Sequence, residues 1–191
     1  MTTTRRILGT SAGVLGALAA IAGRPSPNRP ASIDVTALAR EIDAHTDHVT
    51  AIELAEWIRD RKPGLRVLDV RSDSEYAAYH IPSAEHAPLS SLAAMRPRTG
   101  EMLVLYSEGG AHAGQAWVLL RALGFRDVKF LAGGLLDWLD DVMHPALGTG
   151  PDAQRVAALS RYFGGSPRTG AIVPNGESVT ATVARMRRRG C

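Results

Sequence analysis

The chain has a single cysteine, Cys191, and it is the last residue of the sequence. One cysteine cannot close an internal disulfide or complete a zinc site, so neither is expected to hold this fold together. Lysine is scarce as well, since Lys62 and Lys129 are the two in the chain and arginine carries the remaining basic charge. The sequence has no basic helix with interleaved aromatic residues, so nucleic acid is not an expected partner. We expect no metal and no cofactor.

The composition that is present fits one soluble domain. A chain of 191 residues can bury a real core, and 45% hydrophobic and 21% charged residues are ordinary for a globular protein. Part of the net charge of +3 lies in a C-terminal tail that ends in the residues RMRRRGC. Such a tail is most simply a solvated end, and a docking or redox tail is the alternative.

The N-terminus has the pattern of an export signal. Arg5 and Arg6 precede an apolar stretch, Ile7 to Ala22, which ends in the small residues of Ala20-Ile21-Ala22. This order is typical of a secretory signal peptide, and the arginine pair loosely resembles a twin-arginine signal. A cleaved signal is the first hypothesis, and a membrane tether through residues 5–23 is the second. Both place the domain outside the cytoplasm, either periplasmic or membrane-anchored and facing the periplasm.

Apolar runs and helical patterns alternate along the middle of the chain. Strands are expected at His48-Val49, in RVLDV (66–70), in MLVLY (102–106) and in VKFLAGG (128–134). Helices are expected over 34–44, from a Thr50–Glu53 capping box to Pro63, and over 74–81, 90–95, 111–123, 135–139 and 152–163, with a weak one at 179–189. This alternation predicts an α/β fold with a central parallel sheet and helices on both faces.

The same patterns divide the chain into four parts. Residues 1–22 form the signal peptide or membrane anchor, and 23–45 form a proline-rich linker with one helix. Residues 46–145 form the α/β domain. Residues 146–191 form a C-terminal extension with the basic tail.

Three stretches, in order and in register, resemble the rhodanese family of sulfurtransferases. They are LDVRSDSEYAAYHIPSAEHAP (68–88), the strand, loop and helix around Ser107, and LAGGLLDW (131–138). The resemblance implies a rhodanese-like three-layer fold. The positions that match the family pattern are Asp69, Arg71, Glu75, Tyr76, His80, Ile81, Pro82, Ala84, Gly133, Gly134 and Trp138.

Several of these positions are expected to be structural. Asp69 and Arg71 are expected to form a buried ion pair at a strand end. His80 is more often a hydrogen-bonding residue than an acid–base catalyst in such a setting. The pair Gly133-Gly134 permits a close backbone approach, and Trp138 is expected to pack in the core or at its rim.

The resemblance implies a persulfide mechanism in which a loop cysteine accepts a sulfane sulfur. In this chain Ser107 stands at the cysteine position and His112 at the position of the usual loop arginine. A hydroxyl is not ionised by the setting that tunes a thiol, and it forms no stable persulfide. Glu108 adds like-charge repulsion against an anion. The loop pocket is expected to comprise Glu108, Gly109, Gly110, Ala111 and Ala113.

Three functions remain open. The first is a binding module for an unknown protein or thiol partner, in envelope sulfur or redox handling. The second is a sulfur carrier or redox protein that uses Cys191, whose arginine neighbours would lower the thiol pKa and which could also join two chains in a dimer. The third, a minor alternative, is a hydrolase with Ser107 as nucleophile and His112 as base.

Overall fold

The structure is a computed structural model that describes residues 33–169. The predicted export signal, the weak helix at 179–189, the arginine-rich tail and Cys191 lie outside the described residues. Within 33–169, no helix is both long and apolar enough to cross a membrane.

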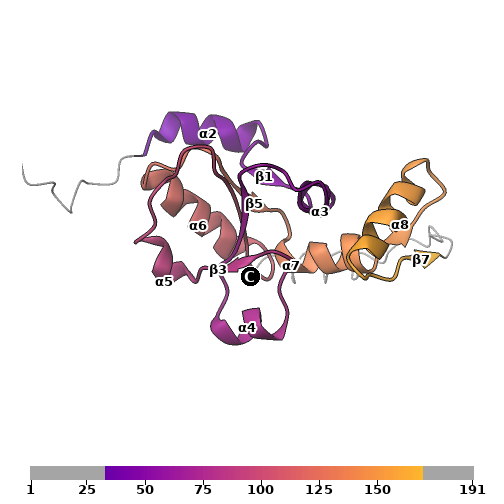
Figure 1. The fold of residues 1–191 in the computed structure, drawn as a ribbon. Coiled ribbons are helices and arrows are strands. Elements are labelled where there is room, and N and C mark those ends of the chain that lie inside the picture. Colours follow the sequence, from indigo (N-terminus) through magenta and orange to yellow (C-terminus); the bar gives the residue numbers. More distant parts are fainter. Residues whose placement is uncertain (1–32, 170–191) are drawn as a thin grey trace, which may run out of the picture. The chain divides into compact units, whose positions relative to one another are not determined.

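A five-stranded parallel sheet forms the centre of the fold (Figure 1). Its spatial order is β1-β5-β4-β2-β3, with neighbouring strands parallel throughout. The bounds are His48–Val49 (β1), Leu65–Asp69 (β2), Glu85–His86 (β3), Met102–Tyr106 (β4) and Val128–Leu131 (β5). A separate parallel pair joins β6 (Ala146–Leu147) to β7 (Arg168–Thr169). The predicted parallel α/β sheet is confirmed.

Helices cover both faces of this sheet (Figure 1). One face packs on α3 (Ala51–Arg59), α7 (Gly134–Asp137), a π-helix η1 (Trp138–Met143) and α8 (Asp152–Tyr162). The other packs on α5 (Leu89–Leu92) and α6 (Ala111–Ala122), with Leu38 from α2 (Val35–Asp43) at its margin. The three-layer arrangement follows from strands that are apolar on both sides and must bury both.

Local caps explain where two of the helices begin. The predicted capping box at α3 is confirmed, because the Glu53 N–H donates to Thr50 Oγ1 at 3.2 Å and the Thr50 N–H donates to Glu53 Oε2 at 2.9 Å. The hydrogen bond from the Thr50 backbone lowers the pKa of Glu53. At α4 (Asp73–Ala78), the Ser72 N–H donates to Glu75 Oε2 at 3.0 Å. Glu75 therefore shapes the start of a helix.

Two regions differ from the pattern expected for them. In α2 the apolar residues Val35, Leu38 and Ile42 recur at helical spacing, which predicts a buried face, but Val35 is 71% and Ile42 is 49% exposed. In the C-terminal extension, α8 returns to the main core, where Leu159 is 1% exposed. The Phe163 ring meets the Trp138 ring edge-on, with centroids 5.0 Å apart. The extension, as far as residue 169, thus contributes to the core of the same sheet.

Candidate functional site

The loop between β4 and α6 lies at the carboxyl edge of the sheet. Asp69 at the end of β2 pairs in register with Tyr106 at the end of β4, and Ser107 follows immediately. The segments that follow two neighbouring parallel strands therefore meet here, which is where open α/β sheets place their binding sites. The three stretches that carry the family resemblance converge at this edge.

The side chain of Ser107 lies inside the loop, and the residue is 2% exposed. Its Oγ accepts hydrogen bonds from the backbone N–H groups of Gly110, at 3.1 Å, and Ala113, at 3.3 Å. Gly110 adopts φ = 93°, a conformation that L side chains rarely adopt and that helps to turn its N–H inward. The loop is thus a cradle of N–H donors, and a neutral hydroxyl occupies its centre.

The start of α7, after the glycine pair that follows β5, donates hydrogen bonds to this loop. The N–H of Leu135 donates to the Ser107 carbonyl at 2.8 Å, and that of Leu136 donates to the Glu108 carbonyl at 3.1 Å. A Cβ on Gly134 would lie 2.3 Å from the Ser107 carbonyl oxygen. The expected close backbone approach is confirmed, and its partner is the candidate loop itself.

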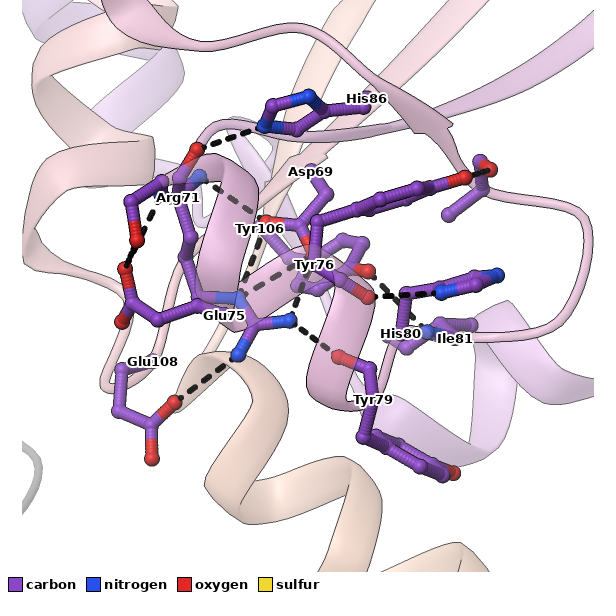
Figure 2. A network of polar contacts seen from close by, with 12 residues as sticks. Asp69, Arg71, Glu75, Tyr76, Tyr79, His80, Ile81, His86, Tyr106 and Glu108 are labelled. Atoms are coloured by element: carbon purple, nitrogen blue, oxygen red, sulfur yellow. Dashed lines mark hydrogen bonds and ion pairs between the residues drawn. The ribbon is translucent and has the colours of Figure 1, made fainter.

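Arg71 connects β2 to the loop (Figure 2). Its guanidinium donates from Nη2 to Asp69 Oδ2 at 2.7 Å, from Nε to Asp69 Oδ1 at 3.0 Å and from Nη2 to the Tyr79 carbonyl at 2.6 Å. Nη1 reaches Glu108 Oε2 at 3.3 Å. The predicted Asp69–Arg71 ion pair is confirmed, while the contact with Glu108, 37 positions along the chain, was not foreseen.

Burial sets the electrostatics of this network. Burial opposes the charge on Arg71, but hydrogen bonding to Asp69 and the charge of that carboxylate outweigh it and raise the pKa of Arg71. Burial, followed by a hydrogen bond to Asp69, raises the pKa of Tyr106. Tyr106 Oη accepts from the Ile81 N–H at 3.1 Å. The Arg71 guanidinium is therefore a fixed cation beside the Asp69 carboxylate, and its raised pKa keeps it from exchanging protons near neutral pH.

Three aromatic rings stack beside the arginine, with Tyr76 between two histidines (Figure 2). The His80 and Tyr76 ring centroids lie 4.1 Å apart, and those of His86 and Tyr76 lie 4.8 Å apart. His80 Nδ1 contacts the Tyr76 carbonyl at 3.0 Å, as expected for a structural residue. His86 Nε2 lies 2.9 Å from the Arg71 carbonyl. The sequence did not predict His86 as a site residue, because no local pattern shows that it pairs beside β2 and contacts the Arg71 carbonyl.

Other predicted site residues make no hydrogen bond to the Ser107 side chain within residues 33–169. Trp138 is 0% exposed and donates from Nε1 to Tyr79 Oη at 3.2 Å, which confirms core packing. Pro82 is exposed in the turn before β3, Gly109 is buried, and Ala111 is exposed at the start of α6.

His112 is exposed on the first turn of α6. No hydrogen bond between His112 and Ser107 is present within residues 33–169. The Ser107 hydroxyl oxygen instead accepts two N–H groups. The geometry therefore supplies no base for the hydrolase hypothesis. The same range contains no cluster of three or more His, Cys, Asp or Glu side chains suited to a metal ion.

Comparison with known proteins identifies the family. Residues 50–141 match the rhodanese-like domain model. The chain therefore belongs to the rhodanese-like domain family through this region, and its α/β fold is the one that the family resemblance predicted.

Three individual similarities illustrate this membership. The HTH-type transcriptional regulator Rv0324 of Mycobacterium tuberculosis is 39% identical over 46% of this chain and 41% of its own length. The probable adenylyltransferase/sulfurtransferase MoeZ of the same organism is 30% identical over 47% of this chain and 24% of its own. The human single domain sulfurtransferase TSTD1 is 30% identical over 49% of this chain and 95% of its own, with a TM-score of 0.45. The chain spans less than half the length of the curated relatives that it matches.

Proposed function

We propose that this is a rhodanese-like binding module whose loop does not transfer sulfur, and that it serves a protein or thiol partner in envelope sulfur or redox handling. The observation that carries the proposal is the Ser107 hydroxyl at the centre of the loop, 2% exposed and holding the N–H groups of Gly110 and Ala113. A cradle of this kind favours a thiolate, because inward N–H groups stabilise negative charge. A serine placed there stays neutral without a base.

The charge at the mouth of the loop supports the same proposal. The carboxylate of Glu108, 53% exposed, lies 3.3 Å from the guanidinium of Arg71, which reaches the loop from β2. An entering anion such as thiosulfate meets the carboxylate first and has no guanidinium at residue 112 to clamp it. The loop therefore suits a neutral or cationic group of a partner better than it suits a free anionic sulfur donor.

The test is sulfur transfer from thiosulfate to cyanide by the full chain and by Ser107→Cys. We expect no transfer through residue 107 in the natural chain and a measurable gain in Ser107→Cys, with a one-sulfur mass increase mapped to the new cysteine. Both chains should also carry Cys191→Ser, so that the tail thiol does not contribute. Transfer by the natural loop in that background would overturn the proposal. No gain in Ser107→Cys would mean that Glu108 and His112 have also removed the anion site.

A second candidate function uses Cys191 as a sulfur carrier or redox thiol. The sequence observation that favours it is the run of arginines at 187–189, which would lower the thiol pKa. The test is the intact mass of the chain before and after incubation with thiosulfate or glutathione persulfide. A one-sulfur gain mapped to Cys191 would make the carrier function the leading one. An unchanged mass with a reduced, accessible thiol would reject it, and a disulfide-linked dimer would identify a redox role.

We also propose export, on the pattern of charge, apolar stretch and small residues at 5–22. Cell fractionation with N-terminal sequencing tests it. A mature chain beginning at Gly23 outside the cytoplasm supports a cleaved signal. A full-length chain in the membrane fraction supports the tether, and a full-length cytoplasmic chain contradicts both.

A further inference from the structure

A second site lies at the other end of β2, away from the loop, where the strand has a neighbour on one side only. Strand β3 pairs with Leu68 and Asp69, whereas β4 pairs with every residue of β2. Over Leu65–Val67, therefore, one edge of β2 has no strand partner within residues 33–169. An edge of this kind presents backbone groups that an extended segment can pair with.

The register determines which backbone groups face this open edge. The Met102 N–H donates to the Gly64 carbonyl and the Val70 N–H donates to the Tyr106 carbonyl, so the even-numbered residues from 64 to 70 face β4. Odd-numbered residues face the other way, as the bond from the Ala87 N–H to the Asp69 carbonyl shows. The Val67 N–H and the Leu65 carbonyl therefore point to the open edge, and β3 starts too late to meet them.

These two groups open onto a groove of about 440 Å³. The C-terminal turn of α3 and the residues after it form one wall, with Trp57, Arg61 and Lys62. The lining also includes Tyr162 of α8, and Ser83 and Glu85, just before and at the start of β3. Val67 is itself 2% exposed. A backbone N–H in so buried a residue needs a partner, because an unpaired buried donor costs free energy. The groove thus combines an unpaired strand edge with aromatic surface.

Charge decides what kind of segment fits. Arg66 pairs with Glu85, which lines the groove, and with Glu101, which does not, at N–O distances of 2.8 Å to each. Neither Arg61 nor Lys62 has an ion-pair partner within the described residues, and the Lys62 ammonium lies over the Trp57 ring, 3.6 Å from its centroid. The four charged residues that line the groove, Arg61, Lys62, Arg66 and Glu85, therefore carry a net charge of +2.

We propose that this groove binds an extended acidic segment of a partner protein by strand addition at Leu65–Val67. A residue of the segment opposite Arg66 provides the acceptor for the Val67 N–H and the donor for the Leu65 carbonyl. Carboxylates on the face of the segment that lies toward this wall pair with Arg61 and Lys62, because alternate side chains of an extended strand share one face. The site is independent of the Ser107 loop and gives the binding module a place to hold a protein partner.

The experiment uses the full chain and a fluorescein-labelled hexapeptide of alternating glutamate and valine, followed by fluorescence anisotropy. We expect saturable binding that Arg61→Glu/Lys62→Glu weakens about tenfold or more, because two attractive charges become repulsive. Arg126→Glu is the matched control, since it reverses an exposed arginine outside the groove. It should change the affinity less than about twofold.

Backbone methylation separates strand addition from simple charge attraction. Successive residues of an extended strand alternate in the direction of their N–H groups. Methylating either the valine or the glutamate nitrogens should abolish binding, while methylating the other set should leave it nearly unchanged. Hydrogen exchange at the Val67 amide should slow on binding of the parent peptide. No saturable binding, equal binding of both methylated peptides, or equal effects of the double variant and Arg126→Glu would each overturn the proposal.

Discussion

Strand β2 has an arginine near each end, and each arginine holds two carboxylates. Arg66 pairs with Glu85 and Glu101 from a side chain that is 23% exposed, whereas Arg71 pairs with Asp69 and Glu108 from a side chain that is 6% exposed. The chemistry of the two clusters is the same and their surroundings differ. Water can replace Arg66 beside Glu85, which is 51% exposed, and Glu101, 8% exposed, keeps the hydrogen bond from the Arg98 N–H. Water cannot replace Arg71 beside Asp69, which is 0% exposed.

The two ends of the strand therefore have different tasks. At the carboxyl end, Arg71 ties together β2, the carbonyl after α4 and the loop after β4, so that the loop has a rigid support. At the amino end, the cluster around Arg66 leaves the strand edge and the groove open. A buried polar network that is fully paired specifies one geometry, while a solvated cluster mainly adjusts local charge.

The sharpest test of this comparison is Arg71→Met against Arg66→Met. Arg71→Met leaves the Asp69 carboxylate buried without its cation, so we expect the free energy of unfolding to fall by about 3–5 kcal/mol. Arg66→Met should lower it by about 1–2 kcal/mol, because Glu85 is 51% exposed and Glu101, although 8% exposed, keeps the hydrogen bond from the Arg98 N–H. Urea denaturation of both variants measures this difference. Equal losses would show that burial does not distinguish the two clusters.

Much of this carboxyl edge could be predicted from the sequence, because its signals are local. A capping box and short apolar runs located the helices and strands, and the Asp69–Arg71 pair lies two positions apart at a strand end. Strand β3 was missed because Glu85 and His86 carry no apolar pattern, and its pairing depends on β2. The Arg71–Glu108 contact joins segments 37 positions apart, a distance that no local pattern encodes.

A smaller loss is expected when the support beneath the loop is disturbed at Gly134. An alanine Cβ would lie 2.3 Å from the Ser107 carbonyl and 2.6 Å from that of Glu108, at a residue with φ = 59°. We expect Gly134→Ala to cost about 2–3 kcal/mol by overpacking and backbone strain. Gly114→Ala is the control, since it meets nothing within 4 Å in helix α6 and should stabilise by up to about 1 kcal/mol. If both variants had the stability of the natural chain, the close packing of Gly134 against the loop would not support the fold.

Glu108, the exposed partner of Arg71, allows the stability of exposed and buried contacts to be compared within one cluster. Glu108 is 53% exposed, and Arg71 keeps Asp69 and the Tyr79 carbonyl when Glu108 is neutralised. Glu108→Gln should therefore cost about 1 kcal/mol or less, again by urea denaturation. A loss as large as that of Arg71→Met would mean that the loop contact, rather than the buried pair, holds this edge together.

The smallest expected effect is a pH dependence at the open end of β2. Hydrogen bonds from Arg66 lower the pKa of Glu85 below its ordinary value of 4.5. A carboxyl whose folded pKa is depressed contributes stability above its unfolded pKa and loses that contribution as the pH falls through its folded pKa. Because Glu85 is 51% exposed, the contribution is screened and should stay below about 1 kcal/mol.

Urea midpoints between pH 6 and about pH 3 should therefore fall less steeply in Glu85→Gln than in the natural chain. Glu53 and Glu75, whose pKa values are also lowered, remain in both proteins and give the shared background slope. Added salt should narrow the difference between the two curves, since it screens a solvated pair more than a buried one. At 1 M salt the Debye length is about 3 Å. A difference that persists there would mean that the Glu85–Arg66 pair is shielded from salt as a buried pair is. The contrast with Asp69 and Arg71 at the other end of the strand would then no longer hold.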